Sequence, residues 1–154
     1  MSDVIEIPVT YAAILEPVVA LAAWTMVMWI WMYATRIPAI NALPKDGAPG
    51  ADVGWTGAKL ESLIAPSIQW KAHNYNHLHE APTVFYAICI VLALIGQGDN
   101  LNATIAWVYV AIRIVHSIWQ ATVNKVMIRF ALFALSSIAL IMLVTHAAMA
   151  LWMH

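Results

Sequence analysis

The chain has 154 residues, of which 63% are hydrophobic and only 10% are charged. A soluble domain carries far more charge, and this balance is typical of a protein embedded in a lipid bilayer. The formal net charge of −1 argues against a nucleic-acid partner, because such a partner requires a basic surface. We therefore expect one integral membrane domain over residues 1–154, with the bilayer as its main surroundings.

The first predicted element is a transmembrane helix over residues 8–36, an almost wholly apolar segment that contains Pro17. Its length is enough to cross a bilayer with some tilt. A cleaved signal peptide is not expected, since the segment has no basic region before it and no small-residue cleavage site after a short apolar core. Residues 37–55 follow and are rich in proline and glycine, which predicts an irregular loop.

A second helix is predicted to begin near Ala58, with Thr56 as its capping residue. Apolar residues at helical spacing begin this helix, which is predicted to continue through the polar residues that follow into a membrane span over residues 78–96 and to end near Gly96. Pro66 and Pro82 interrupt the pattern, and we expect each of them to kink the helix rather than to end it.

Two further spans complete the predicted fold, at residues 103–122 and 128–152. Short turns join them, the first at residues 96–102 and the second at Asn124 and Lys125. Four long helices joined in this way predict an all-α transmembrane bundle of the up-and-down type.

The basic residues predict the orientation of this bundle. Apart from Arg113, every lysine and arginine falls on the side of the long first loop and the last turn: Arg36, Lys45, Lys59, Lys71, Lys125 and Arg129. Cytoplasmic loops carry an excess of such residues. We therefore expect a multi-pass protein of a bacterial inner membrane, with both termini outside the cytoplasm.

The most polar stretch of the chain, residues 71–86, leads directly into an apolar span. It contains His73, His77 and His79, and histidines four residues apart on a helix can share a metal ion. A membrane metal centre needs further histidine clusters on other helices, and His116 is the only other histidine at this depth. Hydrogen-bonding or surface histidines are the better interpretation, and no metal site is expected.

Arg113 lies inside the third span, about 14 Å from its cytoplasmic end at a rise of about 1.5 Å per residue. A charge at this depth needs a partner, and either Glu80 or Glu16 is within reach. An internal ion pair explains Arg113 as well as an active site does. His116 and Gln120 follow on the same helix at helical spacing, so a polar pocket between the second and third helices is reasonable.

Three segments together resemble a known family. They are Asn76-His-Leu-His-Glu-Ala-Pro-Thr-Val-Phe-Tyr86, then Arg113-Ile-Val-His116, then Arg129-Phe130 at the start of the last helix. This set is similar to that of the membrane-associated proteins in eicosanoid and glutathione metabolism (MAPEG), in their bacterial type. The resemblance implies a homotrimer of four-helix protomers that conjugates or isomerises lipophilic small molecules, with glutathione as co-substrate between neighbouring subunits.

The resemblance also implies roles for single residues. Arg129 corresponds to the arginine that holds or polarises the glutathione thiol, and so becomes the candidate catalytic residue. The residues implied to bind glutathione are Lys71, Asn76, Glu80, Arg113, His116 and Gln120. Lysine, arginine and carboxylate groups suit glutathione, which carries two carboxylates and an ammonium.

Two hypotheses from different classes remain open. The first is a glutathione-dependent transferase or peroxidase acting on lipophilic electrophiles, which the retained Asn76, Glu80 and Arg129 favour. The second is a non-catalytic membrane scaffold, an accessory subunit of a larger complex or a lipid-binding protein. Lys71 and Gln120 favour this second hypothesis, because the family's enzymes have arginine at the first position and often tyrosine at the second.

Overall fold

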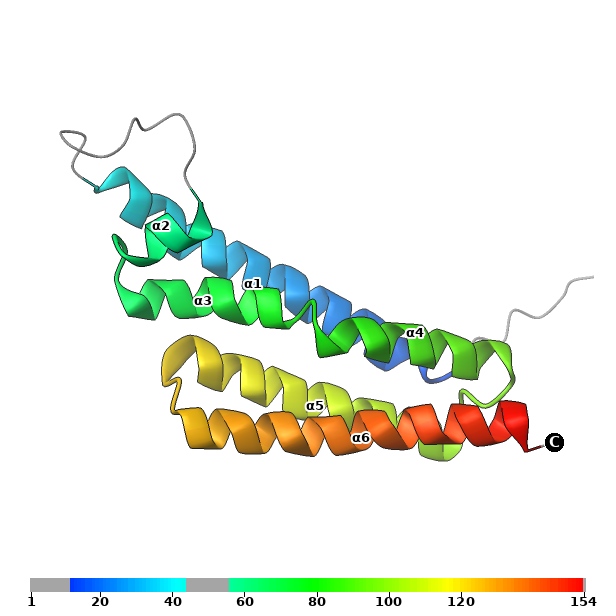
Figure 1. Ribbon diagram of the computed structural model, residues 1–154. Helices are drawn as coiled ribbons and strands as arrows, with labels where there is room; N and C mark the ends of the chain where they lie inside the picture. Colours follow the sequence, from blue (N-terminus) through cyan, green and yellow to red (C-terminus); the bar gives the residue numbers. More distant parts are fainter. Residues whose placement is uncertain (1–11, 44–55, 154) are drawn as a thin grey trace, which may run out of the picture.

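The computed structural model describes residues 12–43 and 56–153, and within these ranges it contains helices and no strand (Figure 1). The helices are α1 (Leu15–Asn41), α2 (Gly57–Glu61), α3 (Pro66–His77), α4 (Ala81–Leu94), α5 (Asn100–Thr122) and α6 (Val126–Trp152). Four segments are long and apolar enough to cross a membrane, with α3 and α4 together forming one of them. The predicted all-α four-helix membrane bundle is thereby confirmed.

Successive spans run in opposite directions along the bundle (Figure 1). One end, called here the terminal end, carries the start of α1, the turn between α4 and α5, and the end of α6. The opposite end, called the loop end, carries the end of α1, α2, α3 and the turn between α5 and α6. Each end brings together polar residues that are far apart in the sequence.

Helix α5 lies at the centre of the bundle and packs against α1, α3 and α6. Its inward face contributes fully buried Tyr109 and Val110 to a core that also contains Leu21, Phe85 and Leu143. The ring of Phe85 stacks on that of Tyr109, with 4.4 Å between the centroids. The outward faces of the other helices carry large exposed apolar side chains, as expected where a helix meets lipid.

Helix α1 extends further than the sequence predicted. It begins at Leu15 and continues beyond Arg36, through Pro38, to Asn41. Pro38 has no N–H to donate to the carbonyl oxygen of residue 34, but it lies in the last turn, so only three further residues of α1 follow it. Residues 8–11 of the predicted span and most of the predicted loop, residues 44–55, lie outside the described part of the chain.

The predicted second helix is divided into α2, α3 and α4, and this expectation of one kinked helix was wrong. Pro66 and Pro82 each lie in the first turn of a new helix, where the missing proline N–H would have had no partner. The cap at Thr56 is confirmed, since its Oγ1 accepts a hydrogen bond of 3.3 Å from the Lys59 backbone N–H. Side chains on the two sides of the break at residues 78–80 therefore do not share one helical face.

A close contact at Gly98 joins the terminal end of α1 to the turn before α5. The Ile14 N–H donates to the Gly98 carbonyl oxygen over 2.8 Å. The Ala13 N–H donates to Oδ1 of Asp99 over 2.9 Å. A Cβ atom on Gly98 would lie only 2.6 Å from the Cβ of Ala12, so this approach requires glycine.

Candidate functional site

The candidate site lies at the break between α3 and α4, where a fully buried arginine meets the end of α3. Nη2 of Arg113 donates to the backbone carbonyl oxygen of His77 over 3.1 Å and lies 3.5 Å from Nδ1 of the same residue. A cation at this position also interacts favourably with the C-terminal end of a helix dipole. Arg113 thus fixes both the end of α3 and the orientation of the His77 ring.

The ion pair expected between Arg113 and Glu80 is not formed among the described residues. Glu80 lies in the break itself, its side chain is 66% exposed, and Oε2 is 3.5 Å from Nε2 of His77. The expectation assumed a continuous helix that would carry Glu80 toward the third span. Because α3 ends at His77, the chain instead turns Glu80 outward.

A second polar contact joins α3 to α5 next to the site. Nδ2 of Asn74 donates to Oγ of Ser117 over 2.6 Å, and both side chains are completely buried. Asn76, the asparagine implied by the resemblance, is exposed instead. The amide that faces α5 is therefore that of Asn74, which lies almost opposite Asn76 around the helix.

A pocket of about 220 Å³ opens beside the His77 ring, at the loop end of the bundle. Its walls come from the end of α3, from α5 and from the first two turns of α6. The lining residues are His77, His116, Val126, Arg129, Phe130 and Phe133. The ring of His77 lies 5.1 Å from that of His116 and 5.6 Å from that of Phe133, measured between centroids. The pocket thus combines two imidazoles and a guanidinium with an aromatic wall.

The turn between α5 and α6 positions Arg129 in this pocket. Asn124 adopts a left-handed conformation with φ of 52°, and its N–H donates to the Trp119 carbonyl oxygen over 2.8 Å, which ends α5. The Asn124 side chain then accepts a hydrogen bond of 2.9 Å from Nη1 of Arg129. One asparagine therefore both ends a helix and orients the guanidinium at the start of the next.

The structure brings together three of the residues selected from the sequence. His116 and Arg129 line the same pocket, and Arg113 lies directly behind it in contact with His77. Gln120 is buried one turn beyond His116, and its Oε1 has no hydrogen-bond partner within the described ranges. Buried polar groups of this kind are rare in a bilayer, where water cannot satisfy them.

The other selected residues lie outside the pocket. Nζ of Lys71 donates to the Ser67 carbonyl oxygen over 2.6 Å and lies 5.6 Å from the centroid of the Trp31 ring. Lys71 therefore faces α1, whereas Asn76 and Glu80 are exposed on the outer surface of the protomer. Within one protomer these three side chains form no common site with Arg129.

Sequence reasoning missed His77 and Phe133 as parts of the pocket. A signal for His77 was present, since it lies three residues after Asn74 and so on the same side of α3. Phe133 lies one turn after Arg129 on α6, at a spacing that also indicates a shared face. From the sequence, His77 is interpreted as a hydrogen-bonding or surface histidine, and Phe133 is one of many apolar residues in the last span.

The neighbouring histidines do not assemble a metal centre. Nε2 of His73 lies 2.8 Å from Oε1 of Glu61, and Nδ1 of His79 lies 2.8 Å from the Tyr75 carbonyl oxygen. The three histidines of this stretch therefore have three different partners. In residues 12–43 and 56–153, no group of three or more histidine, cysteine, aspartate or glutamate side chains is close enough to hold a metal ion.

Comparison with known proteins agrees with this architecture. The family model described as the MAPEG family matches residues 14–149, a range that includes the two turns and nearly all of the four spans. No curated protein and no solved structure matches the chain. The match covers most of the chain, and the four apolar helices indicate an integral multi-pass membrane protein. The chain belongs to the MAPEG family.

Proposed function

We propose that the protein is a glutathione-dependent transferase or peroxidase that acts on lipophilic electrophiles. The observation that carries this proposal is the loop-end pocket, in which Arg129 faces His77 and His116 beside an aromatic wall. Membership of a family generally associated with glutathione supports the choice of co-substrate. The candidate catalytic residue is Arg129. The candidate binding residues beside it in the same protomer are His77 at the end of α3 and Arg113 and His116 on α5.

The chemistry follows from the charge of the pocket. A cation close to a thiol favours the thiolate, which is the form that attacks an electrophile. Arg129 is half-buried in the first turn of α6 and is held by Asn124, so its charge is already oriented. Phe130 lines the same pocket and is 64% exposed, which gives an apolar substrate a route from the bilayer.

We further infer that a neighbouring subunit completes the site, in a homotrimer. The pocket of one protomer, about 220 Å³, is smaller than the roughly 300–1,000 Å³ of pockets that enclose a drug-sized ligand. Asn76 and Glu80 are exposed near the loop end, and polar side chains there favour a protein neighbour over lipid. A neighbouring copy would bring Asn76 and Glu80 toward the glutathione of the next protomer, whereas Lys71 faces α1 of its own protomer.

The proposed orientation puts the loop end in the cytoplasm and both termini outside it, in a bacterial inner membrane. Lys59, Lys71, Lys125 and Arg129 all lie at the loop end, in agreement with the positive-inside rule. Glutathione is abundant in the cytoplasm of cells that make it, so this orientation gives the pocket access to the co-substrate.

Glutathione binding to the detergent-purified protein tests the proposal. Ligand that binds only the folded state stabilises it by about 2.7 kcal/mol at one hundred times its Kd, so the melting temperature should rise with glutathione concentration. Glutamate and glycine at equal ionic strength serve as the control. The same samples are assayed for conjugation of 1-chloro-2,4-dinitrobenzene, and native mass spectrometry reports the number of subunits.

The outcome also decides the alternative, a non-catalytic scaffold, accessory subunit or lipid-binding protein. One observation favours that alternative, namely that Lys71, Asn76 and Glu80 lie outside the pocket of a single protomer. A rise in melting temperature without conjugation would leave a glutathione-binding protein that is no transferase. A stable monomer that shows neither a rise in melting temperature nor conjugation would contradict both the proposed trimer and the proposed glutathione site.

A further inference from the structure

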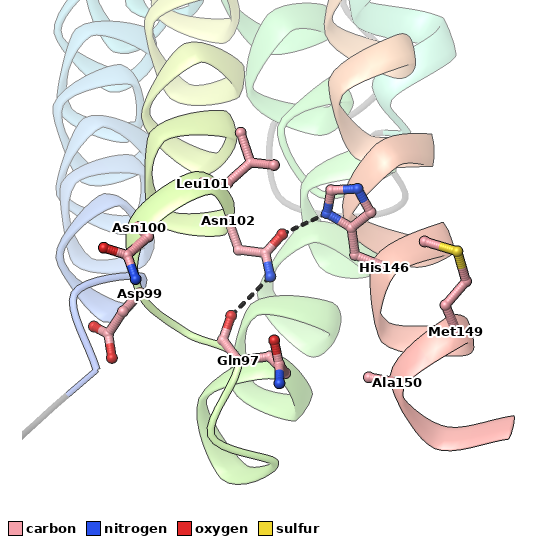
Figure 2. A pocket seen from close by; sticks show the side chains of 8 residues that line it. All are labelled: Gln97, Asp99, Asn100, Leu101, Asn102, His146, Met149 and Ala150. Atoms are coloured by element: carbon pink, nitrogen blue, oxygen red, sulfur yellow. Dashed lines mark hydrogen bonds between the residues drawn. The ribbon is translucent and has the colours of Figure 1, made fainter. Parts of the chain in front are cut away.

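A second pocket, of about 470 Å³, lies at the terminal end of the bundle, away from the loop-end pocket (Figure 2). It is bounded by the turn between α4 and α5, by the first turn of α5, and by the last turns of α6. Figure 2 shows His146 and Met149 of α6 on one side, facing Asn102 and Gln97 on the other. The proposed glutathione chemistry makes no use of these residues.

The hydrogen bonds of Asn102 determine which nitrogen of His146 is free. Nδ2 of Asn102 donates to the Gln97 carbonyl oxygen over 2.8 Å, so its Oδ1 is the atom that faces the histidine. Oδ1 lies 2.6 Å from Nδ1 of His146 and must accept a hydrogen bond from it. In the neutral ring the lone pair is then on Nε2. Histidines that bind metals are held in this way, with the second ring nitrogen donating to an oxygen.

Two thioethers flank this histidine on α6. Met142 lies four residues before His146 and Met149 three residues after it, so all three share one face of the helix, with about 5–6 Å between neighbouring Cβ atoms. The two methionines are 42% and 43% exposed and are not part of the core.

One imidazole and two thioethers are neutral, soft donors. Such a set suits Cu(I), whereas Zn²⁺ and other divalent ions favour thiolate or carboxylate ligands in addition to imidazole. Asp99 also lines the pocket, but Figure 2 shows its carboxylate pointing away from His146, so it is not placed as a ligand. The flexible methionine side chains, with three rotatable bonds, allow both sulfur atoms to turn toward Nε2 of His146.

We propose that Met142, His146 and Met149 form a binding site for a soft monovalent cation, Cu(I) or Ag(I), at the terminal end of the bundle. The ligands bind without loss of a proton when His146 is neutral, and the site gains one positive charge. His146, as a ligand, connects the metal to the first turn of α5 through its hydrogen bond with Asn102. The site is independent of the proposed glutathione activity.

Silver is the probe for the test, because Ag(I) keeps its oxidation state in air. The full chain in detergent is titrated with silver nitrate in chloride-free buffer, with affinity measured by calorimetry and with the methionine methyl groups labelled by ¹³C for NMR. We expect the Met142 and Met149 methyl signals to move together up to one equivalent. The signal of Met127, which is 77% exposed at the other end of α6, should not move.

Matched variants decide whether these sulfur atoms are the ligands. The double variant Met142→Leu/Met149→Leu keeps the size and exposure of both side chains and should bind Ag(I) at least tenfold more weakly, whereas Met127→Leu should bind as the parent does. Cys89→Ala controls for the buried thiol of α4. The proposal is overturned if the double variant retains the parent's affinity, if Cys89→Ala abolishes binding, or if Met142 and Met149 do not respond to silver.

Discussion

Arg113 and His77 are joined by a hydrogen bond between the guanidinium Nη2 and the backbone carbonyl oxygen, 3.1 Å long, at the residue where α3 ends. The arginine is completely buried, and its Nε and Nη1 atoms have no hydrogen-bond partner in the described ranges. The buried guanidinium was expected to pair with a carboxylate, and its hydrogen bond is accepted instead by a backbone carbonyl oxygen. The bond also connects the centre of the bundle to the candidate pocket, because the His77 ring forms part of the pocket wall.

Replacing this arginine should weaken the fold. Arg113→Leu removes a donor from the His77 carbonyl oxygen and leaves part of the guanidinium volume empty, so the free energy of unfolding should fall by about 1–3 kcal/mol. The melting temperature in detergent measures this change, with Arg113→Lys as the variant that keeps the charge. A higher melting temperature for Arg113→Leu would mean that the cost of burying the charge exceeds the value of its hydrogen bond.

The contact at Gly98 predicts a second loss of stability. Gly98→Ala puts a Cβ atom 2.6 Å from that of Ala12, and overpacking of this kind costs about 1–3 kcal/mol. Gly57→Ala is the control, since no atom lies within 4 Å of the Cβ it would add. Thermal unfolding of the two variants should therefore separate them clearly. Equal melting temperatures would show that α1 is not held against the turn before α5.

The proposed role of Arg129 predicts a loss of activity with little loss of stability. Arg129→Leu removes the cation that favours the thiolate, so conjugation of 1-chloro-2,4-dinitrobenzene should slow about tenfold or more, which corresponds to about 1.4 kcal/mol per decade. The control is Lys125→Leu, an exposed cation just before α6 that does not line the pocket. An Arg129→Leu variant that conjugates at the parent's rate would take Arg129 out of the proposed mechanism.

The proposed orientation predicts opposite labelling of the two ends. A cysteine in place of Leu101, which is 60% exposed at the terminal end, should react with a membrane-impermeant maleimide added outside the cell. A cysteine in place of Lys125 should react only after the membrane is opened. The native Cys89 is fully buried and should not interfere. The reverse pattern would place both termini in the cytoplasm.

The spans could be predicted from the sequence because a bilayer demands long apolar helices and little else produces them. The breaks could not be predicted with the same ease. Proline inside a helical pattern indicates either a kink or a new helix, and local sequence does not distinguish the two. In the structure Pro66 and Pro82 each lie in the first turn of a new helix.

The partners of the polar side chains were harder to predict than the depths of these side chains in the membrane. The depth of Arg113 followed from its position in the span, but its acceptor is a backbone oxygen, and every residue has one. Asn74 and Asn76 are equally polar, and only the packing of α3 against α5 shows which of them is buried. The expectation for Asn76 and Glu80 came from the family resemblance, and in the structure both side chains are exposed on the outer surface of the protomer.

The acceptor of Arg113 also bears on how the chain enters the membrane during synthesis. His77 precedes Arg113 in the sequence, and domains are made from the N-terminus onward, so α3 is available before α5 leaves the ribosome. An arginine in the middle of a span is costly to insert alone. Because its partner is a carbonyl oxygen, which no side-chain substitution at residue 77 can delete, an acceptor for Arg113 is present in the membrane when the third span arrives.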